Sequence, residues 1–114
     1  MSQVPPPNSA IAELSSSLGE DSARELVEMF LNSFAAILRD LNGPDREQRK
    51  RAAHSLKSSA RIVGAGVLAN RMAELEARLT NTTGDVTKED LAATVEEFER
   101  VAIGLRAFAQ QAGA

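Results

Sequence analysis

Apolar residues recur at three- and four-residue spacing along most of this 114-residue chain. Such spacing places apolar side chains on one face of an α-helix, so it predicts amphipathic helices and disfavours strands. The longest run covers about five turns and consists of Leu26, Val27, Phe30, Leu31, Phe34, Ile37, Leu38 and Leu41. Comparable runs predict long helices at about 45–63, 67–79 and 88–110, and a short helix after residue 8 or 9.

Residues that favour helix ends lie between these runs. The predicted stops are Gly19, Asn42-Gly43 and Gly64, where glycine can adopt the left-handed conformation that ends many helices. The predicted starts are the capping boxes Ser22-x-x-Glu25 and Thr87-x-x-Asp90, and Pro44 at the first position of its helix. The expected core residues of the 67–79 run are Leu68, Met72, Leu75 and Leu79. We expect Gly64 to have a purely structural role, and Met29, like Met72, to fill the core.

Short connections between these helices favour antiparallel neighbours. We therefore expect an all-α fold, an antiparallel up-down four-helix bundle with a short extra N-terminal helix. The length fits one domain, which we place at residues 9–112. Residues 1–8 contain three consecutive prolines and are expected to form a flexible tail.

The composition argues against several classes of function. A net charge of −3 disfavours a dedicated nucleic-acid binder, which needs clustered lysine and arginine. The absence of cysteine rules out disulfides, a thiolate metal site and a cysteine nucleophile. The sequence shows neither a signal-peptide pattern nor a run of about 20 apolar residues. We therefore expect a cytoplasmic protein that does not contact membranes.

The only histidine of the chain lies within the predicted helix at 45–63, but outside its apolar face. That apolar face contains Leu56, Ala60 and Val63. The polar face contains His54, Lys57, Ser58 and Arg61. An exposed imidazole beside cations and small hydroxyl side chains suits the acceptance and release of an anionic group, which we interpret as a phosphoryl group.

The stretch from His54 to Ala65 resembles the histidine-containing phosphotransfer (HPt) domain of multistep two-component signalling. That family has a lysine three residues after its histidine, a small residue next, and Gly-Ala ten and eleven residues after the histidine. The matching positions here are Lys57, Ser58 and Gly64-Ala65. The family most often has glycine at the position of Ser58, so the serine narrows the space for an incoming group by one hydroxymethyl.

The resemblance implies a phosphorelay intermediate. His54 would accept a phosphoryl group from the aspartyl phosphate of a receiver domain and pass it to another receiver domain, without kinase activity of its own. The implied partners are response-regulator receiver domains and a hybrid histidine kinase. The receiver domain would supply the divalent metal, so we expect no cofactor or metal site in this chain. We also expect a monomer.

Several residues around the histidine are candidates for supporting roles. Lys57 would neutralise the phosphoryl oxygens, with further support from Ser58 and Arg61. Lys50 and Arg51, earlier on the same helix, are candidates for contact with the partner.

Two further sets of residues each have two interpretations. Ile11 and Leu14 of the short first helix either form an apolar patch that docks the receiver domain or close the open end of the bundle. Glu76 either reaches back to the histidine helix or pairs with Arg71 or Arg78 within its own helix.

Two alternative functions remain open. One is a non-catalytic helical adaptor that binds receiver domains through the same face. The other is the dimerisation and phosphoacceptor helix pair of a histidine kinase, a family with an acidic residue directly after its histidine and a proline five residues on. This chain has Ser55 and Ser59 at those positions and lacks a nucleotide-binding domain.

Overall fold

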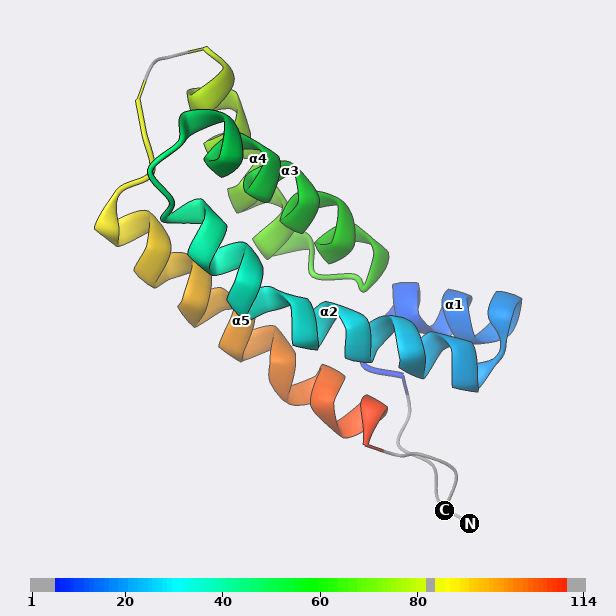
Figure 1. Cartoon of the computed structure of the whole chain (residues 1–114). Helices are drawn as coiled ribbons and strands as arrows, with labels where there is room; N and C mark the ends of the chain where they lie inside the picture. The colour runs from blue at the N-terminus through cyan, green and yellow to red at the C-terminus, as the bar shows by residue number, and fades with distance from the viewer. Residues whose placement is uncertain (1–5, 82–83, 111–114) are drawn as a thin grey trace.

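The computed structural model describes residues 6–81 and 84–110, which form five α-helices and no β-strand. The helices are α1 (Ser9–Leu18), α2 (Glu20–Leu41), α3 (Arg46–Ile62), α4 (Gly66–Thr80) and α5 (Lys88–Ala109) (Figure 1). The expected all-α fold is confirmed, and each predicted helix is present close to its expected bounds. Within the described ranges no helix combines the length and apolar character that a membrane span needs.

Two pairs of neighbouring helices build the molecule (Figure 1). α3 packs along α4 and α2 packs along α5, while α2 also contacts α3 and α1. The chain is elongated, with extents of 52 × 22 × 18 Å. Only Gly19 separates α1 from α2, so α1 folds back onto α2.

The core is built from the apolar stripes that the sequence predicts. On α4 the buried residues include Leu68, Met72, Leu75 and Leu79, all as expected. The rings of Phe34 and Phe98 stack with centroids 3.7 Å apart, and Phe30 packs beside Phe98, which joins α2 to α5. The core position expected for Met29 is wrong, since Met29 is 65% exposed. It lies two residues, or about 200° around the helix, from the buried Val27.

Gly19 ends α1 as predicted, but α2 starts earlier than predicted. Gly19 has a φ of 91°, and α2 begins directly after it at Glu20. Ser22 and Glu25 therefore lie inside the helix, and the predicted capping box does not form. Ala23, in the first turn of α2, is fully buried.

The start of α3 also differs from the prediction, because another residue caps the helix. Asp45 is the N-cap of α3, and its carboxylate accepts a hydrogen bond of 3.3 Å from the backbone N–H of Glu47. Pro44 precedes this cap instead of occupying the first helical position. The Asp45 carboxylate accepts a hydrogen bond from a free backbone N–H in the first turn of α3. The proline side chain has no acceptor atom and cannot cap the helix in this way.

Gly64 has the predicted left-handed conformation, with a φ of 77°. The side-chain amide of Asn8 fills the space where a Cβ at this position would lie. That amide accepts a hydrogen bond from the N–H of Ile11 and donates one to the carbonyl of Val63, both 2.9 Å long. Asn8 therefore belongs to the folded domain and ties α1 to the end of α3. Residues 1–5 of the expected tail lie outside the described residues.

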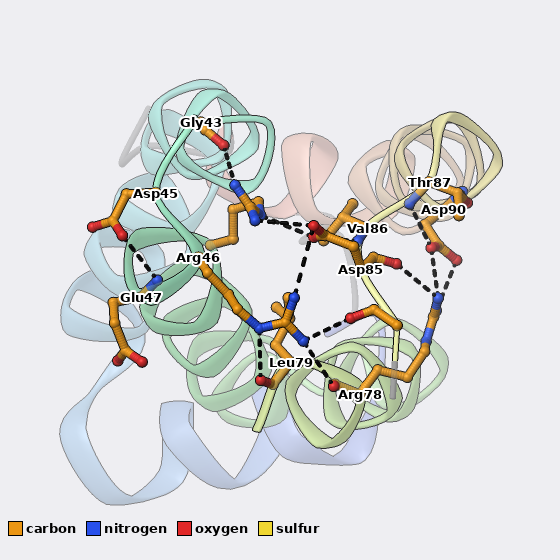
Figure 2. A network of polar contacts seen from close by, with 12 residues as sticks. Gly43, Asp45, Arg46, Glu47, Arg78, Leu79, Asp85, Val86, Thr87 and Asp90 are labelled. Atoms are coloured by element: carbon orange, nitrogen blue, oxygen red, sulfur yellow. Dashed lines mark hydrogen bonds and ion pairs between the residues drawn. The ribbon is translucent and has the colours of Figure 1, made fainter. Parts of the chain in front are cut away.

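A polar network fastens the helix ends around the segment before α5 (Figure 2). Arg46 donates to the carbonyls of Leu79 and Gly84 at 3.2 and 2.7 Å. Arg49 binds the carboxylate of Asp85 through two hydrogen bonds of 3.0 Å. These contacts hold the end of α4 and the following segment against the start of α3.

Thr87 and Asp90 form the predicted capping box at the start of α5 (Figure 2). The Asp90 carboxylate accepts from the Thr87 N–H at 2.9 Å, and the Thr87 hydroxyl accepts from the Asp90 N–H at 3.0 Å. Arg78 of α4 adds two hydrogen bonds of 2.9 Å to the same carboxylate. The hydrogen bonds from Arg78, with support from Thr87, lower the pKa of Asp90 to about 2.

Candidate functional site

His54 lies in the middle of α3, and 61% of its side chain is exposed. The opposite face of α3 contributes Ala53 and Leu56 to the core, and α4 contributes Leu75. Because α3 and α4 pack along each other, Glu76, the residue after Leu75, lies at the edge of their contact. The two helices thereby bring Glu76 to the polar face that contains His54.

Glu76 connects His54 to Lys57. Its Oε2 lies 2.8 Å from Nδ1 of His54, and its Oε1 accepts a hydrogen bond from the Lys57 ammonium. The hydrogen bond from Lys57, followed by that from His54, lowers the pKa of Glu76 although partial burial opposes this. The carboxylate is therefore ionised at neutral pH and can only accept hydrogen bonds. It follows that Nδ1 carries the proton and that Nε2 of the neutral ring keeps its lone pair.

This arrangement prepares one atom for nucleophilic attack. The ring of His54 is exposed and held at Nδ1, so Nε2 is free to attack an electrophile. Positive charge that develops on the ring lies beside the Glu76 carboxylate, which stabilises it. The Lys57 side chain completes the cluster and is only 17% exposed.

The other two residues predicted to support the phosphoryl group lie apart from this cluster. Ser58 and Arg61 are exposed on the polar face of α3. None of the hydrogen bonds or ion pairs among the described residues joins either of them to His54. Lys57 is brought to the histidine, but through Glu76 rather than by direct contact.

A hollow of about 420 Å³ opens beside the imidazole. It is lined by Glu47, Lys50, Arg51, His54, Ser55 and Glu76. Lys50 and Arg51 precede the histidine by four and three residues, so they lie one turn away from it on α3. The two candidates for partner contact therefore flank the free space at His54.

For Glu76 the sequence left two interpretations open, a contact with the histidine helix or an ion pair within its own helix. Its partners lie 22 and 19 positions away on another helix. Arg78, a partner expected within α4, pairs with Asp90 instead. The one signal in the sequence was the position of Glu76 directly after a core residue, which places it at the flank of the apolar stripe.

Of the two α1 candidates for docking, the structure rules out one. Ile11 is fully buried, and Leu14 is partly buried against the core. A docking role for Ile11 is therefore wrong, because no partner can reach a side chain without exposed surface. Ile11 instead closes the core beneath α1, and partner contact by Leu14 stays a prediction.

Exposed apolar side chains gather between α2 and α3. Met29 is 65% exposed and Ile62 50% exposed, and both border a hollow of about 240 Å³. The residues that line it, here called the apolar patch, are Leu26, Met29, Phe30, Ser33, Ser59, Ile62 and Val63. Ile62 follows His54 by eight residues, or about 12 Å along α3. One partner domain of ordinary size can therefore cover both the imidazole and the apolar patch.

The described residues hold no group of three or more histidine, cysteine, aspartate or glutamate side chains that could bind a metal ion. In the cluster at His54, the ammonium of Lys57 already binds the one carboxylate, Glu76. A positive neighbour of this kind opposes the binding of a further cation.

Comparison with family models matches residues 25–112 to the family described as Hpt domain. The matched region contains nearly all of α2 and the whole of α3, α4 and α5, with His54, Lys57 and Glu76. Comparisons with curated proteins and with solved structures gave no match. The predicted family is thus confirmed: this chain belongs to the Hpt domain family, whose members act in phosphotransfer of two-component signalling and interact with receiver domains and kinases.

Proposed function

We propose that this protein is a phosphorelay intermediate in which His54 carries the phosphoryl group. The observation that carries the proposal is the contact between Nδ1 of His54 and Glu76, because it leaves Nε2 as the nucleophile on an exposed ring. The group comes from the aspartyl phosphate of one receiver domain and passes to another receiver domain. The chain needs no kinase activity of its own for this reaction.

In the proposed transfer, the Nε2 lone pair of His54 forms a bond to phosphorus while the P–O bond to the aspartyl carboxylate breaks. The bonding pair of electrons leaves on that carboxylate. Nδ1 keeps its proton, so the ring gains positive charge that the neighbouring Glu76 carboxylate balances. The reverse sequence passes the group to the second aspartate. Phosphoryl transfer depends mainly on alignment and charge neutralisation, and the receiver domain supplies the aspartate and the divalent metal.

We propose that the receiver domain covers His54 and the apolar patch together. Met29 and Ile62 offer the exposed apolar area that the centre of a protein interface buries. This assignment places the docking surface on α2 and α3 instead of on α1.

We further propose that α2 to α5 form an antiparallel up-down bundle and that the protein acts as a monomer. The pairing of α3 with α4 and of α2 with α5 supports this architecture, as do the short connections between successive helices. Light scattering tests the monomer. A single species near 12.2 kDa would support it, and a stable dimer would contradict it.

The decisive experiment is phosphotransfer from a receiver domain charged with labelled phosphate, with wild type compared with His54→Gln. We expect acid-labile, base-stable label on the wild type alone, because only a nitrogen–phosphorus bond combines these properties. Binding of the uncharged receiver domain is measured in parallel and should be retained in His54→Gln. A wild type that binds the receiver domain but never takes up label would contradict the proposal and favour the helical adaptor.

A further inference from the structure

The cations around His54 differ in how far they are already neutralised. Lys57, which the resemblance assigns to the phosphoryl oxygens, has its ammonium on Glu76 and a side chain that is only 17% exposed. An ammonium that already faces a carboxylate neutralises less of the charge on an incoming anion. Further positive charge that this chain offers to a phosphoryl group therefore comes from other residues.

Lys50 and Arg51 line the hollow beside His54. In the part of the chain that the structure describes, no hydrogen bond or ion pair engages either side chain. Two other arginines of the same helix, Arg46 and Arg49 in its first turn, are bound by Asp85. Lys50 and Arg51 are therefore cations that remain available next to the imidazole.

The charge of the whole helix points the same way. α3 holds six of the thirteen lysine and arginine residues of the chain, and only one of its sixteen acidic residues. The chain as a whole nevertheless carries a net charge of −3. An anion that approaches α3 thus meets a positive surface on a negative molecule, which favours its approach to this helix over the others.

Helix geometry places these two cations on the open side of the ring. Side chains of an α-helix lean toward its N-terminus, so the imidazole of His54 extends over the turn that contains Lys50 and Arg51. The hollow at this point measures about 420 Å³, many times the roughly 30 Å³ that one water molecule occupies. The hollow beside the imidazole is therefore large enough for a phosphoryl group.

We propose that Lys50 and Arg51 form the anion-binding part of the phosphoryl site, while Glu76, which lines the same hollow, holds Nδ1 of the ring and binds Lys57. Lys50 and Arg51 bind the non-bridging oxygens as the group moves onto Nε2 of His54. The guanidinium of Arg51 can engage two of these oxygens at once. The proposal rests on the proposed function, because it requires His54 to be the carrier.

The test uses phosphoramidate as a small phosphoryl donor, so that docking of a receiver domain plays no part. The rate of phosphohistidine formation is measured for wild type and for the double variant Lys50→Gln/Arg51→Gln. The matched control is Lys88→Gln/Arg100→Gln, which removes the same two charges from α5. A second variant, Lys50→Arg/Arg51→Lys, keeps both charges, and circular dichroism verifies the fold of each protein.

We expect the rate of Lys50→Gln/Arg51→Gln to fall by about 10- to 100-fold, the loss expected for one or two charge-assisted hydrogen bonds. The control should stay within about twofold of wild type, and the charge-conserving variant should recover most of the rate that Lys50→Gln/Arg51→Gln loses. Equal rates for Lys50→Gln/Arg51→Gln and the control, with receiver binding weakened only in the former, would overturn the proposal and leave these residues a docking role. A wild type that accepts phosphoryl groups from neither phosphoramidate nor a charged receiver domain would overturn the proposed function itself.

Discussion

Glu76 contacts His54 with one carboxylate oxygen and Lys57 with the other, so one residue sets the tautomer of the ring and the position of the ammonium. The pKa of Glu76 is lowered first by Lys57 and then by His54. The carboxylate therefore stays ionised even where an ordinary glutamate begins to take up protons. At the scale of single residues, the nucleophile that we propose depends on Glu76, which does not itself react.

We expect Glu76→Ala to slow phosphorylation of His54 by about tenfold, because the ring loses a charge-assisted hydrogen bond worth roughly 1.5–3 kcal/mol. Nitrogen-15 NMR of the imidazole should show both tautomers in the variant, whereas the proton stays on Nδ1 in the wild type. Glu74→Ala on the same helix is the control, since Glu74 is exposed. A wild-type rate and a single tautomer in Glu76→Ala would contradict this role.

At the scale of helices, two capping boxes of the same sequence pattern have opposite outcomes. Thr87-x-x-Asp90 forms its box, and Arg78 of α4 adds two hydrogen bonds to the same carboxylate. Ser22-x-x-Glu25 forms none, because α2 already begins after Gly19. The capping box forms where the helix begins directly after its first residue, as at Thr87, and not where the helix begins earlier, as at Ser22.

Asp90→Asn should destabilise the fold at neutral pH and lose its effect in acid. The pKa of Asp90 is lowered from 3.8 to about 2, so the carboxylate stabilises the folded state fully above pH 3.8 and loses this effect as the pH falls through about 2. We expect Asp90→Asn to lower the free energy of unfolding by about 1 kcal/mol at pH 7. The difference from wild type should shrink toward pH 2.

Urea unfolding at several pH values measures this difference. Asp21→Asn is the control, because the carboxylate of Asp21 is highly exposed and its ion pair with Arg24 joins neighbours on one helix. Such surface pairs contribute little to stability. Equal stability of Asp90→Asn and wild type at neutral pH would show that the contacts of Asp90 with Arg78 and Thr87 do not stabilise the fold.

At the scale of the whole molecule, three parts of the α3 surface have different roles. Its buried face packs on α4, its polar face presents His54, and its C-terminal end joins α2 to form the apolar patch. α1 closes the core through Ile11 and is tied to the end of α3 by Asn8. The docking surface that we propose therefore lies on the outer faces of α2 and α3.

Ile62→Ser should weaken receiver binding while leaving the chemistry of His54 intact. Loss of one apolar side chain from an interface costs roughly 1.5–3 kcal/mol, so we expect the Kd to rise at least about tenfold. Phosphorylation by phosphoramidate should remain at the wild-type rate. Ile103→Ser is the matched control, since Ile103 is 73% exposed on α5. Equal receiver affinity of both variants and wild type would remove the apolar patch from the interface.

The sequence by itself determined which residues form helices and which face of each helix is apolar, because both follow from local spacing. It thereby placed His54 on the surface of α3 and Gly64 in a left-handed turn. The sequence also contained enough information to predict that Met29 is exposed. Met29 lies two residues after the buried Val27, and two residues along a helix lead nearly to its opposite face.

Only the tertiary structure decided which helix covers which face. The contact of Glu76 with His54 spans 22 residues and two helices, and the burial of Ile11 depends on where α1 folds back. The physical reason is that helical periodicity describes one helix at a time. Contacts between helices depend on how their side chains pack together, which no single periodicity contains.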